Sequence, residues 1–191
     1  ESDIVDVSTF ILRPYTVGGD MDLGSADDAD AGTLEIPTSA FNLFDTTIGQ
    51  VKFGWLNGDP GSSSDGTGTI TVRDATFNSP LDVQASGVGG VVELLGTLTG
   101  NDDATVDLNA ESITSGDGDG AAINTAGNTV RYRGAVTLEG NSTVSTGGAG
   151  GDIDFDDAAT IDDDGAGGSN QWDLTLTAGT GSVSFGDAVG A

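Results

Sequence analysis

A short strand pattern recurs along this chain, and it restricts the chain to architectures built from many similar β-strands. Each copy starts at a small residue, alternates apolar with polar residues, and ends near a second small residue. Three copies share the full layout: residues 68–75 (GTITVRDA), 151–158 (GDIDFDDA) and 181–188 (GSVSFGDA). Looser copies occupy residues 49–54, 104–110 and 134–140. The alternation predicts strands with one buried and one solvent-facing side.

A second, shorter apolar position follows several copies after a bend, namely Phe77, Ile113, Val144 and Ile161. A strand, a tight turn and another strand is the pattern of one coil of a solenoid. The copies are roughly 17 to 30 residues apart, within the range of solenoid periods. The extra length falls in polar inserts that we expect to be surface loops, at residues 57–68, 116–120 and 162–170.

Glycine is spread through the whole chain, which argues against long helices. The chain has 32 glycines, and each costs about 1 kcal/mol relative to alanine inside a helix. We therefore predict an all-β fold, a right-handed parallel β-helix (β-solenoid). The alternative is an antiparallel β-sandwich or jelly roll, which also has many short strands. The β-helix is favoured because the strand layout recurs without hairpin signals at fixed positions.

The charge of the chain excludes several classes of partner. It has 31 acidic and 5 basic residues, for a net charge of -26. Nucleic acids and anionic lipids would be repelled, and no run approaches the ~20 apolar residues of a membrane helix. We therefore expect no nucleic-acid partner and no membrane insertion. Such charge opposes compaction unless ions screen it, which favours a salty or calcium-containing environment outside the cell or at its surface.

The acidic clusters make Ca²⁺ the candidate ion, although we expect no required cofactor. Calcium takes six to eight oxygen ligands, chiefly from carboxylates and carbonyls. The alternative for each cluster is a solvated acidic surface. The glycine-rich residues 147–152 nearly match a calcium nonapeptide, but Ile153 falls one place early and the motif is not repeated in tandem. The candidate metal ligands are Asp102, Asp103, Asp117, Asp119, Asp162, Asp163 and Asp164.

Catalysis is poorly supported, and we expect no enzyme. The absence of Cys and His excludes thiol and imidazole metal sites and the common nucleophile–base pairs. Arg131 and Arg133 flank Tyr132 on one strand, and we expect them to form salt bridges with acidic neighbours; a carboxylate or a sugar is the alternative partner. We expect Trp55 and Trp172 to cover the core or an edge; stacking on sugars is the alternative.

We expect a single β-rich domain over residues 1–191, a fragment of a longer repetitive chain. Its first part, residues 1–56, is richer in aromatic residues, and residues 57–191 are repeat-like. Residues 4–12 have the pattern of one long apolar strand. The alternative for this strand is pairing with a neighbouring molecule by strand addition.

Two regions resemble the large repetitive bacterial exoproteins related to filamentous haemagglutinin. Residues 9–24 (TFILRPYTVGGDMDLG) resemble one of their recurrent segments, and residues 146–155 (TGGAGGDIDF) and 174–185 (LTLTAGTGSVSF) look like their tandem repeats. The resemblance covers the first 24 residues and most of 129–191, whereas residues 49–74 depart from it. It implies a right-handed parallel β-helix with a role in adhesion or matrix building, and it assigns no functional residues.

We therefore predict a non-catalytic structural or adhesive segment of a secreted or cell-surface bacterial exoprotein. Its partners would be its own chain or neighbouring copies, and a surface receptor or glycan. One alternative is a subunit of a self-assembling extracellular filament, in which exposed strands pair between subunits. A lesser alternative is a polysaccharide-binding or polysaccharide-cleaving β-helix protein.

Overall fold

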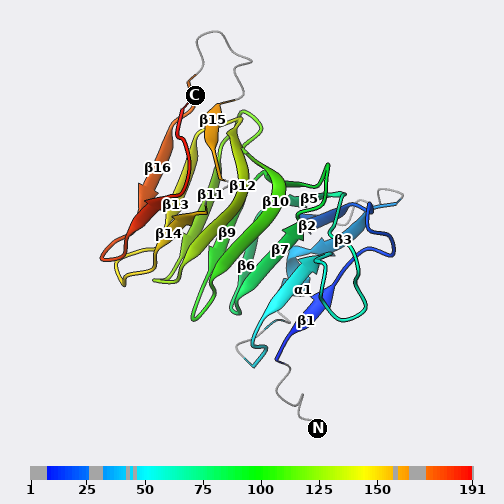
Figure 1. Ribbon diagram of the computed structural model, residues 1–191. Helices are drawn as coiled ribbons and strands as arrows, with labels where there is room; N and C mark the ends of the chain where they lie inside the picture. Colours follow the sequence, from blue (N-terminus) through cyan, green and yellow to red (C-terminus); the bar gives the residue numbers. More distant parts are fainter. Residues whose placement is uncertain are drawn as a thin grey trace.

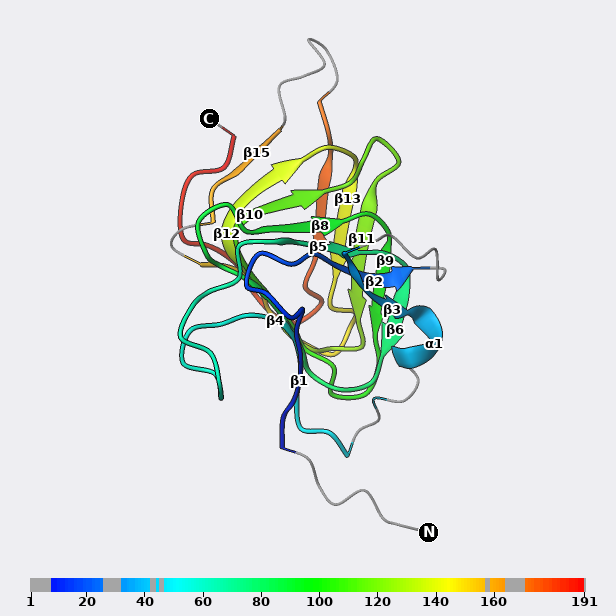
Figure 2. The ribbon, with the colours of Figure 1, turned by 90° about the vertical axis from the view of Figure 1, so that its right-hand side faces the viewer.

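The chain winds into a three-faced parallel β-helix (Figures 1 and 2). The computed structural model describes residues 8–25, 32–41, 44, 47–156, 159–163 and 171–190. Every pair of strands among these residues is parallel. The predicted parallel β-helix is therefore confirmed, and the antiparallel sandwich is wrong for this part of the chain.

Two of the three faces belong to one 12-stranded sheet that turns a corner. The strands of face A, in stacking order, are β1 (Phe10–Leu12), β4 (Val51–Gly54), β7 (Leu81–Ala85), the first halves of β10 (Val106–Ser115) and β12 (Val130–Leu138), β14 (Ile153–Phe155) and β17 (Val183–Phe185). Those of face B are β3 (Leu34–Pro37), β2 (Met21–Ser25), β5 (Thr69–Val72), β8 (Val91–Leu94), the second halves of β10 and β12, and β15 (Ile161–Asp163).

Face C is a separate five-stranded sheet. It consists of β6 (Ala75–Phe77), β9 (Thr97–Gly100), β11 (Ala121–Thr125), β13 (Ser142–Ser145) and β16 (Leu174–Thr177). One coil therefore runs through faces A, B and C in turn before the next coil stacks on it. Viewed along the stack, the strands surround a central core (Figure 2).

The core is built from rows of apolar side chains in register between coils. Burial alternates in strands such as β12, as predicted, whereas every residue of β7 is buried and every residue of β17, at the open end, is exposed. One row of face A ends in three stacked rings, Tyr132, Phe155 and Phe185, whose successive centroids are 4.7 and 5.2 Å apart. Each fully buried large side chain contributes about 1.5–3 kcal/mol, and the repetition of these rows stabilises the stack.

The corner between faces A and B differs from coil to coil. In β10 and β12 the chain passes it without a loop, whereas β4 and β5 are joined by residues 55–68. Gly134, at the bend of β12, has a φ of 142°, and a Cβ there would overlap the carbonyl oxygen of Ala110. The bend therefore requires glycine at this position.

The end of the stack near β1 is closed by an aromatic cluster and a short helical turn. Helix α1 (Thr38–Phe41) contacts β2, β3 and β6, next to the first strand of face C. Phe41 and Phe44 are buried and pack against Phe53, with ring centroids 5.8 and 6.1 Å away. The aromatic-richer first part predicted from the sequence thus includes an aromatic cluster and a helical turn, and α1 lies beside β3 and β6 (Figure 2).

The opposite end of the stack is open. Phe185 in β17 is 45% exposed and Val189 is 53% exposed. Val189 forms an isolated parallel bridge with Ile161, so it continues face B beyond β15. Among the described residues, no strand pairs with the outer edges of β16 and β17.

The coils clarify why the repeat spacing in the sequence is irregular. The copies at residues 68–75 and 134–140 lie on face B, whereas the copies starting at residues 49, 104, 151 and 181 lie on face A. Along face A alone, the equivalent residues Val51, Leu81, Val106, Val130, Ile153 and Val183 are 23 to 30 residues apart. The repeat identified in the sequence therefore mixed strands of face A with strands of face B, which made its spacing irregular.

Some predicted features fall partly outside the described residues. Of the long apolar strand expected at residues 4–12, the structure describes residues 8–12, and β1 pairs with β4 of the same chain. The insert at residues 116–120 is a loop as expected, and most of the insert at 162–170 lies outside the described part. No helix in the described residues is long and apolar enough to cross a membrane.

The stacked rings give a direct test of the core. Phe155 is 1% exposed, and Phe155→Ala is expected to cost about 3–5 kcal/mol of unfolding free energy because it removes a buried ring and leaves a cavity. Phe185→Ala, one coil further along the same row, is the matched control and should cost less than half as much. Urea denaturation followed by circular dichroism measures both, and equal losses would contradict the assigned stacking order.

Candidate functional site

The outer side of face A carries a row of charged residues of both signs, in which Asp82 and Asp107 are adjacent like charges. The outward residues Lys52, Asp82, Asp107, Arg131 and Asp154 are in register on successive coils. Neighbouring strands are about 4.8 Å apart, so each charged group lies close to the next one. We call these five residues the charged row. Three of the chain's five basic residues lie on this face: Lys52, Arg131 and Arg133. Arg133 is two positions after Arg131, so it has the same outward orientation.

Salt bridges hold the charged row together. Lys52 Nζ is 3.1 Å from an oxygen of Asp59, in the loop after β4, and 3.5 Å from Asp82 Oδ2. Arg131 Nε donates to Asp154 Oδ2 at 3.1 Å. Partly buried pairs of this kind gain more than surface pairs, because water screens them less. The predicted salt bridges are confirmed for Arg131, and also for Arg133, which pairs with Asp107 and Asp156.

A second row of polar groups lies beside the first, nearer to the corner with face B. Gln84, Asn109 and Arg133 are in register on β7, β10 and β12, and Asp156 follows β14. Asn109 Nδ2 donates to Gln84 Oε1 at 2.8 Å. Arg133 Nη2 donates to Asp107 Oδ2, and Arg133 Nε lies 3.5 Å from Asp156 Oδ2.

Burial changes the protonation of the carboxylates in the charged row. Burial raises the pKa of Asp107 to about 6, although the guanidinium of Arg133 acts in the opposite direction. Burial also raises the pKa of Asp82, against a hydrogen bond from Gln84 and the charge of Lys52. The pKa of Asp154 is lowered instead, because the hydroxyl of Ser184 donates a hydrogen bond to its carboxylate.

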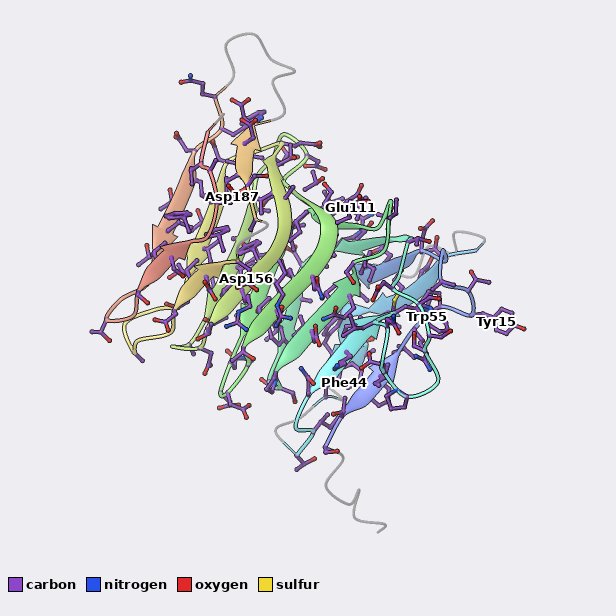
Figure 3. The ribbon with its side chains drawn as sticks, viewed as in Figure 1. Tyr15, Phe44, Trp55, Glu111, Asp156 and Asp187 are labelled. Atoms are coloured by element: carbon purple, nitrogen blue, oxygen red, sulfur yellow. The ribbon has the colours of Figure 1, made fainter. Side chains whose placement is uncertain are left out.

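A groove opens where the second row meets the corner between faces A and B. Its volume is about 700 Å³, and its lining residues are Ser86, Asn109, Ala110, Glu111, Arg133, Gly134, Ala135 and Asp156. Glu111 and Asp156 are labelled in Figure 3, at the bend of β10 and just after β14. The charged row and this corner groove together form the candidate functional site.

The sequence analysis did not single out most of this site. Asp82, Asp107, Asn109, Glu111 and Asp156 become neighbours only when coils stack. Aligning the segments LDVQA, VDLNA and VRYRG of β7, β10 and β12 would have shown a column of charged and amide side chains. The alignment needs the correct face for each copy, which the sequence did not provide.

The predicted calcium ligands lie at different corners of the coil. Asp102 and Asp103 are in the turn between β9 and β10, whereas Asp117 and Asp119 are in the loop between β10 and β11. Asp102 has a φ of 50°, and its carbonyl accepts a hydrogen bond from Asn128 Nδ2 at 2.6 Å.

The third predicted cluster follows face B. Asp162 and Asp163 end β15, and Asp164 lies outside the described residues. The backbone N–H of Asp163 donates to Asp162 Oδ1 at 2.9 Å. Within the described part of the chain, no three acidic residues form a group that could hold a metal ion. Calcium binding thus stays a prediction.

The two tryptophans lie in different surroundings, and Trp172 packs against the core as expected. Trp55 Nε1 donates to the carbonyl of Pro14 at 3.0 Å, and the guanidinium of Arg13 lies 4.3 Å from the centre of its ring system. Trp55 and the fully exposed Tyr15 lie at the β1 end of the stack (Figure 3). Trp172 packs partly buried against the core near the other end. Trp55 therefore forms a cation–π contact with Arg13.

The pKa of Asp107 predicts an unusual dependence of stability on pH. Because its pKa is raised in the folded state, this carboxyl favours folding below about pH 4, and that contribution is lost as pH rises through about 6. The loss should be up to about 3 kcal/mol. Asp107→Asn is expected to abolish this part of the slope in urea denaturation at pH 4, 5, 6 and 7.

Asp154→Asn is the matched control for this titration. The pKa of Asp154 is lowered, so its carboxylate stabilises the fold above its unfolded pKa and this contribution is lost as pH falls. The control should therefore flatten the slope on the acid side and leave the decline near pH 6. A wild-type profile without any decline between pH 5 and 7, or one unchanged in Asp107→Asn, would contradict the assignment.

Comparisons with known proteins found no relative of this chain. No protein-family model, no curated protein and no solved structure matches the chain. The resemblance to haemagglutinin-related exoproteins therefore stays an expectation from the sequence. The fold and the candidate site are described from the chain's own residues.

Proposed function

We propose that this chain is a non-catalytic structural or adhesive segment of a secreted or cell-surface bacterial exoprotein. The observation that carries the proposal is the continuous parallel stacking of face A from β1 to β17. Strands β1 and β17 lie at opposite ends of the stack (Figure 1). A solenoid of this kind separates what is attached to its two ends, and its length grows with the number of coils.

The non-catalytic part of the proposal is supported by the use of the basic residues. A protein that cleaves acidic polysaccharides needs cationic groups to hold its substrate. The four cationic groups besides Arg13 are all in ion pairs with aspartates: Lys52 with Asp59 and Asp82, Arg73 with Asp22, Arg131 with Asp154, and Arg133 with Asp107. Arg13 covers Trp55 and donates to the carbonyl of Pro60 at 2.7 Å.

The proposed location rests on composition and on the resemblance. The net charge of -26 keeps such a segment dispersed, and dissolved salt outside the cell would screen its self-repulsion. The resemblance to repetitive exoproteins supports the same compartment and an adhesive role.

A structural segment that carries mechanical force should unfold one coil at a time. We expect single-molecule pulling from the two termini to release the chain in steps of 23 to 30 residues, the spacing of equivalent positions on face A, because each coil contacts mainly its neighbours. Release of the whole stack in one step at low force would contradict the structural role. Shortening of any polysaccharide by the purified chain would contradict the non-catalytic role.

A self-assembling filament is the second candidate, and the open end of the stack favours it. The outer edge of β17 carries the half-exposed Phe185, and β1 at the other end pairs on one side only among the described residues. Unpaired strand edges with exposed apolar residues are templates for strand addition. The aromatic cap at α1 would limit such contacts at the other end to faces A and B.

Salt should reveal this assembly, because it screens the repulsion between acidic copies. In high salt we expect filaments with a regular axial repeat in electron micrographs, and Phe185→Asp should reduce them at least tenfold in a sedimentation assay. Val88→Asp changes another exposed apolar residue, which lies in the loop between β7 and β8 away from the end of the stack, and should have no effect. A chain that stays monomeric at every salt concentration would exclude the filament.

A further inference from the structure

The corner groove has a shape that follows from the coils that form it. Its floor is made by Ala110, Gly134 and Ala135, at the bends where β10 and β12 turn the corner without a loop. Ser86 and Asp156 lie on its two sides, where the coils of β7 and β14 leave the sheet. Small side chains over two adjacent coils thus leave a hollow of about 700 Å³, a volume typical of ligand sites.

The polar groups in the groove are held in place before any ligand arrives. Asn109 is fixed by its hydrogen bond to Gln84, and Arg133 by its ion pair with Asp107. Glu111 accepts a hydrogen bond from the backbone N–H of Gly89, in the loop between β7 and β8. Groups held in this way lose little conformational freedom when they bind a ligand.

One polar atom of a groove-lining side chain lacks a hydrogen bond. Arg133 Nε is buried without a hydrogen bond within the described structure. It lies 3.5 Å from Asp156 Oδ2, a distance longer than a well-formed hydrogen bond. A hydroxyl group donates one hydrogen bond and accepts others, so a ligand hydroxyl matches both the guanidinium of Arg133 and the carboxylate of Asp156.

The charges that line the groove favour neutral ligands. An anion would face the carboxylates of Glu111 and Asp156 in a chain whose net charge is -26, and a bare cation would meet the guanidinium of Arg133 beside only two carboxylates. Neutral ligands with many hydroxyls avoid both penalties and can still use the charged groups, since hydrogen bonds to ionised partners are the stronger kind.

We propose that the corner groove binds a neutral carbohydrate, with Arg133, Asn109, Glu111 and Asp156 as its polar contacts. This inference names the class of ligand for the adhesive role, and it therefore rests on the adhesive part of the proposed function. Ligand binding and the mechanical role are measured separately. The groove could therefore fail while the stepwise unfolding of the stack is still observed, and the reverse also holds.

The test uses a bulky side chain on the groove floor. The probe is an array of immobilised neutral, carboxylated and sulfated oligosaccharides, followed by calorimetric titration with the neutral oligosaccharide that binds best. The wild-type chain should prefer neutral glycans, and Ala135→Leu should weaken binding at least tenfold because its side chain occupies the floor. Arg133→Gln should weaken binding by a similar factor.

The matched control is Ala122→Leu, the same change at an outward position of β11 on face C. It should leave glycan binding unchanged, and thermal melting of all three variants verifies that they are folded. The proposal is overturned if no neutral glycan binds, if Ala135→Leu and Ala122→Leu bind equally well, or if carboxylated or sulfated glycans are preferred.

Discussion

The hydrogen bonds between successive coils are the interaction on which the rest of this structure depends. Within the stack, strands pair in parallel with strands of the adjacent coils, so the register of an inner strand is fixed by its neighbours on both sides. A shift of one residue would turn every apolar side chain outward and every charge inward. The core rows, the charged row and the corner groove are all consequences of one shared register.

The same register allows a very acidic chain to place charges close together. On face A the basic residues Lys52, Arg131 and Arg133 occur at positions where the adjacent coils present aspartates. Asp82 and Asp107 are buried enough for their pKa values to rise, so this arrangement costs stability at neutral pH. Perturbed pKa values are concentrated at functional sites, which supports a ligand-binding role for this face rather than a role in stability alone.

Much of the fold could be predicted from local pattern. The alternation of apolar and polar residues in segments such as GTITV and GDIDF predicts one-sided strands, and the scattered glycines exclude long helices. The choice of a solenoid over a sandwich was correct because no hairpin turns recur. The alignment of copies was partly wrong, since residues 68–75 and 134–140 resemble face A copies but lie on face B. Faces A and B have the same local requirement, so their strands look alike in sequence.

By itself, the sequence determined the class of structure: many short one-sided strands, few helices and a strongly acidic composition. Those properties depend on residue type and local spacing. Only the tertiary structure decided which residues became neighbours, because Asp107 and Arg133 are far apart along the chain and meet through the stacking of β10 on β12. The groove also depends on the tertiary structure. It forms where β10 and β12 turn the corner without a loop, between the coils of β7 and β14, whose strands end before the corner.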